Sequence, residues 1–185
     1  MVLMLRWWID MQIERIPEIA LTHADEVEIA QLLNRGFQED FGGRSYHQQR
    51  HHMRLIVRGH GVIIGHMAIC YRAVRLGEAL ITICGLAEVV TAPELRGKGL
   101  ATAMLNDAIT FAKSTSASFF VLFGDRPIYA GHGFVKQRNS LTQVVLGYAK
   151  TGDIKTGLVA DLMVLPLGDQ SWDKDAHLDL LGHKF

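Results

Sequence analysis

The fold of this chain is decided by the stretch Val89-Val90-Thr91-Ala92-Pro93-Glu94-Leu95-Arg96-Gly97-Lys98-Gly99-Leu100-Ala101. An apolar run ends at Pro93, and two glycines then precede residues that are apolar at helical spacing, so the pattern predicts a strand, a turn and a helix. Free N–H groups at a helix start, reinforced by the helix dipole, form an anion site. The stretch therefore predicts a phosphate-binding turn.

The residues of this turn favour a phosphate but do not form a standard nucleotide motif. Glycines let the backbone approach a phosphate closely, and Arg96 and Lys98 add positive charge. The turn is not a Walker loop, because no Gly-Lys-Ser/Thr with its upstream glycine is present, and it is not GxGxxG. A helix start that merely contains two glycines and two solvated cations stays open as the alternative.

Working outward, the pattern predicts a mixed α/β fold. Thr22 is expected to cap a first helix, with Asp25 as the acidic half of a capping box and Val27, Ala30, Leu33 and Phe37 on its apolar face. The expected elements are a strand at 13–21, helices at 23–36 and 45–53, strands at 55–57, 62–75 and 79–91, a helix at 99–113, a strand at 119–123, a helical turn at 127–131, and strands at 134–137 and 158–165.

Length and charge exclude several classes of protein. The 185 residues fit one domain, because domains usually run to about 100–150 residues. Nineteen basic and nineteen acidic side chains give no net charge, which removes the usual footprint of a nucleic-acid binder. The apolar lead-in at 1–12 is broken by Arg6 and Asp10, so no membrane span or signal peptide is expected. We expect a cytoplasmic protein with a main domain at 13–167 and a tail at 168–185.

The two cysteines predict reduced thiols. If Leu76-Gly77-Glu78 is a three-residue hairpin loop, Cys70 and Cys84 lie directly opposite each other on paired strands. Such positions rarely suit the geometry of a disulfide, so two small buried hydrophobic side chains are the favoured interpretation.

Two motifs together resemble the GCN5-related N-acetyltransferase (GNAT) superfamily. Arg96-Gly97-Lys98-Gly99-Leu100-Ala101 resembles its Arg/Gln-x-x-Gly-x-Gly/Ala signature, and Tyr129-Ala130-Gly131-His132-Gly133-Phe134 resembles its Tyr-x-x-x-Gly-Phe element. The likeness covers residues 13–167. It implies a mostly antiparallel sheet with splayed parallel strands 4 and 5, flanked by helices, and acetyl-CoA as cosubstrate. The residues implied in holding the coenzyme are Val89, Val90, Thr91, Arg96, Gly97, Lys98, Gly99, Leu100, Ala101 and Thr102.

The resemblance also implies an acid and a base. An alkyl amine with a pKa near 10 is only about one part in a thousand free base at pH 7, and a carboxylate acting directly or through water can remove its proton. Glu88 is the candidate base, and a surface or salt-bridged glutamate is the alternative. Tyr129 is the candidate acid for the leaving sulfur, with a packing role as the alternative. Backbone N–H groups of Val89 or Val90 would polarise the thioester carbonyl.

A finer resemblance concerns the acceptor. Residues 36–56 and 62–85 and the ending Val164-Leu165-Pro166 are similar to aminoglycoside 2'-N-acetyltransferases, and the middle stretch is more weakly similar to nodulation acyltransferases. This likeness implies acceptor contacts from Asp40, Phe41, Tyr46 and Asp161. The chain departs from that family at His51-His52, where the family has glycines, and at its basic tail. Glu88 is offset by one residue, so a bulge is needed to superpose it.

The expected activity is acetyl transfer to a primary amine of a small molecule, with an aminoglycoside or amino sugar as the leading specific acceptor. A non-catalytic acyl-CoA-binding module and an acyltransferase for longer chains are the alternatives.

His47 and His51 would share a face of a helix, but no cysteine pair or carboxylate completes a metal site, so no metal is expected. The tail would close over the acceptor site or form a homodimer interface.

Overall fold

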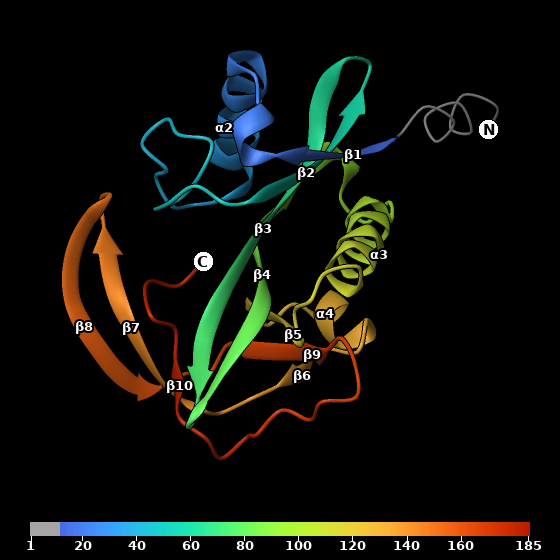
Figure 1. Cartoon of the computed structure of the whole chain (residues 1–185). Helices are drawn as coiled ribbons and strands as arrows, with labels where there is room; N and C mark the ends of the chain where they lie inside the picture. The colour runs from blue at the N-terminus through green and yellow to red at the C-terminus, as the bar shows by residue number, and fades with distance from the viewer. Residues whose placement is uncertain (1–11) are drawn as a thin grey trace. The chain divides into compact units, whose positions relative to one another are not determined.

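The computed structural model describes residues 12–185, which form two compact units (Figure 1). The first unit contains residues 12–69 and 88–107 of the described chain, and the second contains residues 70–87 and 108–185. Strands β3 (Val62–Leu76) and β4 (Ala79–Thr91) contribute residues to both units. Apart from residue 12, the predicted lead-in at 1–12 lies outside the described residues.

In the first unit, three antiparallel strands follow one another in space. Strand β1 (Ile13–Pro17) pairs with β2 (Met53–Gly59), and β2 pairs with β3. A short 3-10 helix, η1 (Glu18–Ala20), leads to helix α2 (His23–Gly36). The capping box is confirmed, because Asp25 N–H donates to Thr22 Oγ1 at 3.2 Å and Thr22 N–H donates to Asp25 Oδ2 at 3.0 Å.

The apolar face of α2 differs from the predicted one. The buried apolar residues of the helix are Ile29, Leu32 and Leu33, whereas Val27 is 42% exposed. They join a cluster that also contains Phe41, Ile56, Ile63, Val90 and Ala92. At the last residue of the helix, a Cβ on Gly36 would lie 2.1 Å from Val90 Cγ2. The helix therefore needs a glycine where it meets β4.

The second unit contains the pair of parallel strands that the predicted fold class includes. Its strand order is β6-β9-β5-β4-β3-β10-β7-β8. Strands β4 and β5 (Phe119–Phe123) are parallel and pair from Ile83 with Phe119 to Leu86 with Leu122. The other strands of this unit are β6 (Val135–Lys136), β7 (Ser140–Gly147), β8 (Lys150–Leu158), β9 (Leu162–Pro166) and β10 (Leu178–Asp179). The mixed α/β fold with parallel β4 and β5 is confirmed.

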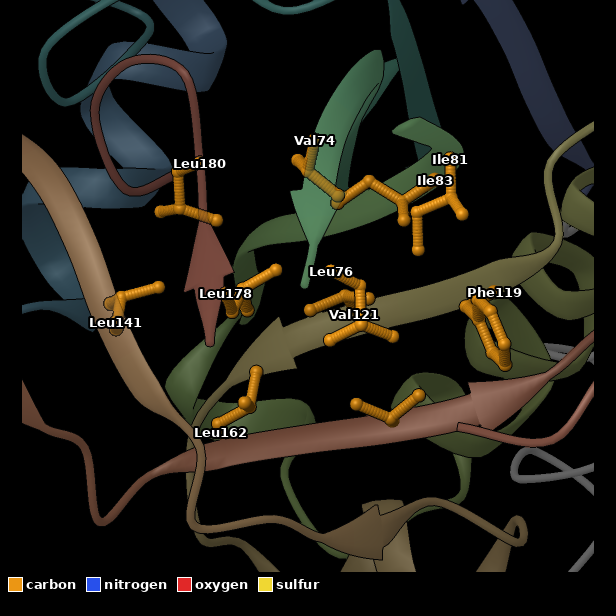
Figure 2. Packing of buried hydrophobic residues seen from close by; sticks show 11 residues of the cluster. Val74, Leu76, Ile81, Ile83, Phe119, Val121, Leu141, Leu162, Leu178 and Leu180 are labelled. Carbon is orange, nitrogen blue, oxygen red and sulfur yellow. The ribbon is translucent and has the colours of Figure 1, made fainter. Parts of the chain in front are cut away.

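Figure 2 shows the core of the second unit. Side chains from β3, β4, β5, β7, β9 and β10 meet there, and each is at most 8% exposed. The first four residues of β5 are buried, as its wholly apolar sequence predicted. Residues of the tail complete this core, because Leu178 and Leu180 are buried in it and Trp172 contacts Phe119 edge to face at 5.0 Å.

The predicted helix at 45–53 is wrong. The segment between α2 and β2 contains turns and bends and no helix. Two of its backbone groups bind side chains, because Arg54 Nη1 donates to Ser45 O at 2.8 Å and His47 N–H donates to Glu88 Oε1 at 2.6 Å. Tertiary contacts thus override the local pattern.

The predicted strand at 158–165 is also wrong in its bounds, and the β7–β8 hairpin was not predicted. The turn of this hairpin is formed by Tyr148 and Ala149, whose φ angles are 50° and 57°. Such turns usually carry glycine or asparagine, so the sequence lacks the expected turn signal. All residues of β8 are exposed, so its sequence does not show the alternation of apolar and polar residues by which a half-buried strand is predicted.

The β3–β4 loop has two residues, Gly77 and Glu78, and not three. As a result Cys70 faces Gly85 and not Cys84, since a Cβ on Gly85 would lie 2.5 Å from Cys70 Sγ. Both cysteines are buried free thiols, and burial raises the pKa of Cys70 to about 12. Within residues 12–185, none of the helices has the length and apolar character needed to cross a membrane.

The contact between Gly36 and Val90 predicts a stability effect. G36A should lower the free energy of unfolding by about 1–3 kcal/mol, because the added methyl overpacks the cluster that holds β4. G131A is the control, since a Cβ there meets nothing within 4 Å. Urea unfolding of both variants measures the difference, and equal midpoints would contradict the close approach.

Candidate active site

The turn between β4 and α3 (Leu100–Lys113) has the backbone that the sequence predicted. After β4, η2 (Pro93–Leu95) leads to Gly97 and Gly99, whose φ angles are 72° and 82°. Residues other than glycine rarely adopt this left-handed conformation. The sequence of the turn therefore supplies glycine where the backbone requires it.

Five amide groups in this turn and at the start of α3 have no protein acceptor among residues 12–185. Within residues 12–185, the N–H groups of Gly97, Gly99, Leu100, Ala101 and Thr102 hydrogen bond to no protein group. Residues 96–99 are exposed, and a Cβ at Gly97 would meet nothing within 4 Å. Because α3 is a full helix of 14 residues, its dipole adds to these donors. The turn can therefore bind an anion.

Contacts within the first unit fix the start of α3. Leu100 is buried, and Ala92 N–H donates to Ile64 O at 2.8 Å. A Cβ on Gly65 would lie 2.6 Å from Met104 Sδ, so this glycine lets the helix approach β3 closely. The anion-binding turn is thus held by packed elements on both sides.

The three residues predicted to run along the coenzyme lie at the end of β4, in the same unit as the turn. Val90 is buried in the cluster of α2, whereas Val89 and Thr91 are half-buried. The β4–β5 pairing ends at Leu86, and β4 continues to Thr91.

Glu88 has an unusual backbone conformation. Five non-glycine residues in the described chain have positive φ, and Glu88, at 52°, is the one that lies inside a strand. Such a conformation carries about 1–3 kcal/mol of strain and persists where surrounding contacts enforce it.

The carboxylate of Glu88 is enclosed by three partners, and its side chain is 5% exposed. Oε1 accepts the backbone N–H of His47 at 2.6 Å and lies 2.9 Å from His51 Nε2. Oε2 accepts Arg54 Nη1 at 3.1 Å. Burial alone would raise the pKa of Glu88, but contact with His51 and the nearby positive charges outweigh it and hold the pKa below its usual value. Glu88 is thus a buried anion.

Arg54 and His66 complete this network, and the sequence did not single out either residue for it. Arg54 is fully buried, and its Nε and Nη2 donate to Glu18 at 2.6 and 3.1 Å. His66 Nδ1 lies 3.1 Å from Glu88 O, and its Nε2 lies 3.1 Å from Arg54 Nη1. Burial and Arg54 lower the pKa of His66 to about 3, so its ring is neutral, donates from Nδ1 and accepts at Nε2. The sequence signal for this buried network was Arg54, a charged residue directly before the apolar run Leu55-Ile56-Val57.

Tyr129 lies in the second unit, on the short helix α4 (Pro127–Gly131). Its side chain packs against Phe134, with ring centroids 6.2 Å apart, and against Gly124, where a Cβ would lie 3.2 Å from its ring. Burial raises the pKa of Tyr129 above its ordinary value. Its hydroxyl group has no hydrogen-bond partner in the part of the chain that the structure describes.

The candidate acceptor residues of the first unit lie between α2 and β2. Asp40 is exposed, and its Oδ1 accepts Gly42 N–H at 2.6 Å. Phe41 is buried in the core cluster. Tyr46 lies under two guanidinium groups, with Arg44 at 5.7 Å and Arg50 at 4.9 Å from its ring centroid.

Asp161 lies in the second unit and contacts the tail. Lys184 Nζ is 3.3 Å from its Oδ1, and the same ammonium lies 4.3 Å from the ring centroid of Phe123. The tail lysine thus neutralises the acid that was predicted to attract the acceptor.

The helix on which His47 and His51 would have shared a face is absent, so the spacing argument for a metal does not hold. Residues 12–185 contain no group of three or more His, Cys, Asp or Glu side chains arranged to hold a metal ion.

Comparisons with known proteins agree with this fold. A family model described as an acetyltransferase (GNAT) domain matches residues 19–136. No curated protein matches the chain in sequence. The chain is similar to the solved structure of a GNAT family acetyltransferase from Brucella melitensis in complex with acetyl-CoA, with a TM-score of 0.58 and 19% identity over 90% of this chain and 94% of that one.

Two further solved structures show the same likeness. For the GNAT family N-acetyltransferase YhbS from Escherichia coli in complex with CoA, the TM-score is 0.60 and the identity 18%, over 91% of this chain and 87% of that one. For an acetyltransferase of the GNAT family from Streptococcus pneumoniae, the TM-score is 0.54 and the identity 20%, over 86% and 100%. These structures share the fold of the chain.

The low pKa of His66 predicts a pH dependence of stability. Below pH 6.5 His66 binds a proton in the unfolded chain, whereas in the folded chain it stays neutral down to about pH 3. The free energy of unfolding therefore falls as the pH drops across this window. One proton contributes a slope of at most about 1.4 kcal/mol per pH unit. Urea unfolding of H66N between pH 7 and 5 should show a shallower slope than the wild type.

H23N, at an exposed position on α2, is the control for this measurement and should keep the slope of the wild type. An unchanged slope in H66N would mean that His66 does not resist protonation in the folded state.

Proposed function

The chain belongs to the GNAT acetyltransferase family, and we propose that it transfers the acetyl group of acetyl-CoA to a primary amine of a small molecule. The observation that carries the proposal is the set of five amide N–H groups at the start of α3 that donate to no protein acceptor among residues 12–185. Solved relatives with the same fold contain acetyl-CoA or CoA. A diphosphate is the group that such a turn suits.

The residues of the first unit fit this coenzyme. Amide donors, two glycines at positive φ and the cations of Arg96 and Lys98 match a diphosphate in charge and in hydrogen bonding. The end of β4 would hold the pantetheine arm, and the turn would hold the phosphates. The residues proposed to bind the coenzyme are Val89, Val90, Thr91, Arg96, Gly97, Lys98, Gly99, Leu100, Ala101 and Thr102.

Glu88 supplies the negative charge for proton removal from the amine. When bound, acetyl-CoA provides the acetyl group as an activated thioester. The Glu88 carboxylate is enclosed by Arg54, His47 and His51, so it acts on the amine through an intermediate group or water and not by direct contact. Backbone N–H groups of Val89 or Val90 polarise the reacting carbonyl.

Tyr129 supplies the proton for the leaving sulfur. Its raised pKa keeps the hydroxyl protonated at neutral pH, and no protein acceptor in the described chain competes for that proton. A hydroxyl group in a mostly buried position is suited to protonate a thiolate.

For the acceptor, an aminoglycoside or amino sugar is the specific proposal. Asp40, Tyr46 and Asp161 are the side chains proposed to contact it, and the buried ring of Phe41 would fix the loop that carries Asp40 and Tyr46. The pairing of Asp161 with Lys184 leaves less negative charge for a polycation, which favours an acceptor with few amino groups.

Calorimetry with acetyl-CoA, followed by a free-thiol release assay over a panel of amines, tests the function. We expect binding by the wild type and thiol release with at least one amine. Binding without release against any amine would favour a non-catalytic acyl-CoA-binding module, which the enclosed state of Glu88 would suit. Thiol release with longer acyl-CoA only would identify the chain as an acyltransferase for longer chains.

The anion-binding turn predicts the effect of removing a cation. R96A should weaken acetyl-CoA binding by about 10-fold, because a charge-assisted hydrogen bond contributes about 1.5–3 kcal/mol and a flexible exposed side chain realises the lower part of that range. K113A removes a cation at the other end of α3 and should leave the affinity unchanged. Calorimetric titration of both variants makes the comparison, and equal affinities would place the phosphates elsewhere.

The role of Tyr129 predicts a separation of turnover from binding. Y129F should lower kcat by about 10²–10³-fold, since general acid catalysis contributes in that range, and should leave acetyl-CoA affinity nearly intact. Y148F changes a tyrosine that is 91% exposed in the β7–β8 turn and serves as the control. Turnover by Y129F at the wild-type rate would remove Tyr129 from the mechanism.

A further inference from the structure

The buried position of Glu88 raises the question of which atom takes the proton from the amine. Each oxygen of its carboxylate already has a partner, and its pKa is lowered. A carboxylate in this state is a weak base, but it is well placed to orient a neighbouring base and to stabilise the positive charge that this base acquires.

Among residues 12–185, His51 is the only partner of the Glu88 carboxylate that can itself accept a proton with its side chain. His47 binds Glu88 through its backbone N–H, and Arg54 is permanently charged. His51 Nε2 is buried and lies 2.9 Å from Glu88 Oε1, at an ion-pair distance but without the geometry of a hydrogen bond. Its Nδ1 hydrogen bonds to no group among residues 12–185.

Resting on the proposed function, we propose that His51 Nδ1 is the atom that takes the proton from the acceptor ammonium, with Glu88 as its orienting partner. A lone pair on Nε2 would face the Glu88 carboxylate oxygen at 2.9 Å and be repelled by it, so the neutral ring carries its proton on Nε2 and its lone pair on Nδ1. An N–H bond of the ammonium breaks, an Nδ1–H bond forms, and the amine becomes a neutral nucleophile. The imidazolium then rests against the Glu88 carboxylate and later releases its proton to water.

The charges around His51 suit this transfer. Glu88 on β4 and Glu18 on η1 are carboxylates that interact with His51, and Arg54 on β2 lies between them. His66 on β3 is neutral because its pKa is about 3. Arg50 also pairs with Glu18, at 3.1 Å, and with Glu26, so Glu88 is the carboxylate whose charge faces the ring most directly. His51 also belongs to the same unit as the anion-binding turn.

The tautomer of His51 is the first test, because it needs no turnover. In the ¹⁵N-labelled full chain at pH 8, imidazole NMR should show His51 protonated at Nε2 and not at Nδ1, with the assignment made by the loss of the signal in H51Q. Protonation at Nδ1 would overturn the proposal, because that nitrogen could then accept no proton.

Kinetics of H51Q give the second test, since glutamine retains an N–H donor for Glu88 but provides no base. With ethylamine, kcat at pH 7 should fall by about 100-fold, and the defect should shrink as the pH is raised toward 10. With 2,2,2-trifluoroethylamine, which is largely neutral at pH 7, the variant should match the wild type within about 3-fold. H52Q, at the exposed neighbouring position, is the control.

The outcomes separate this proposal from the function on which it rests. If the wild type binds no acetyl-CoA, the proposed function is wrong. The NMR measurement of the His51 tautomer still tests the arrangement of His51 and Glu88 in that case. Equal loss with both amines would assign His51 a structural role and overturn the proposal, although acetyl transfer by the wild type would stand. Wild-type activity of H51Q with ethylamine at pH 7 would overturn it as well.

Discussion

The first unit depends on the pairing of two buried charges, Arg54 and Glu88. Each side chain is almost fully removed from water, so each charge must find its partners inside the protein. Arg54 divides its donors between Glu18, Ser45 and Glu88, and thereby joins η1, the loop before β2, and β4. Removal of Arg54 would take the buried cation away from both Glu88 and Glu18, which is why this residue constrains so much of the surrounding chain.

The strained backbone of Glu88 follows from the same pairing. The carboxylate of Glu88 contacts Arg54 and His51, while Val90, two residues on, lies in the core beside Gly36. The contacts of Glu88 hold its positive φ in place. The strand that leads into the anion-binding turn is thus positioned by charge on one side and by apolar packing on the other.

The sequence predicted the parts whose signals are local. Gly97 and Gly99 indicated the turn, the apolar run of β5 indicated a buried strand, and Thr22 with Asp25 indicated the helix start. The sequence did not predict the parts of the structure that depend on contacts between residues far apart in the chain. Residues 45–53 look helical until Arg54 and Glu88 bind their backbone, and the β7–β8 turn uses Tyr148 and Ala149 at positive φ. The partnership of His51 with Glu88 joins residues 37 positions apart, and no spacing rule connects them.

The insertion of β10 between β3 and β7 has a consequence for folding on the ribosome. All residues of the first unit lie before residue 108, so this unit can fold while the chain is still being made. The sheet of the second unit joins β3 to β7 through Leu178 and Asp179, and Leu180 fills its core. Nascent chains shorter than about 180 residues therefore expose an apolar sheet surface, and binding by a chaperone during synthesis would protect it.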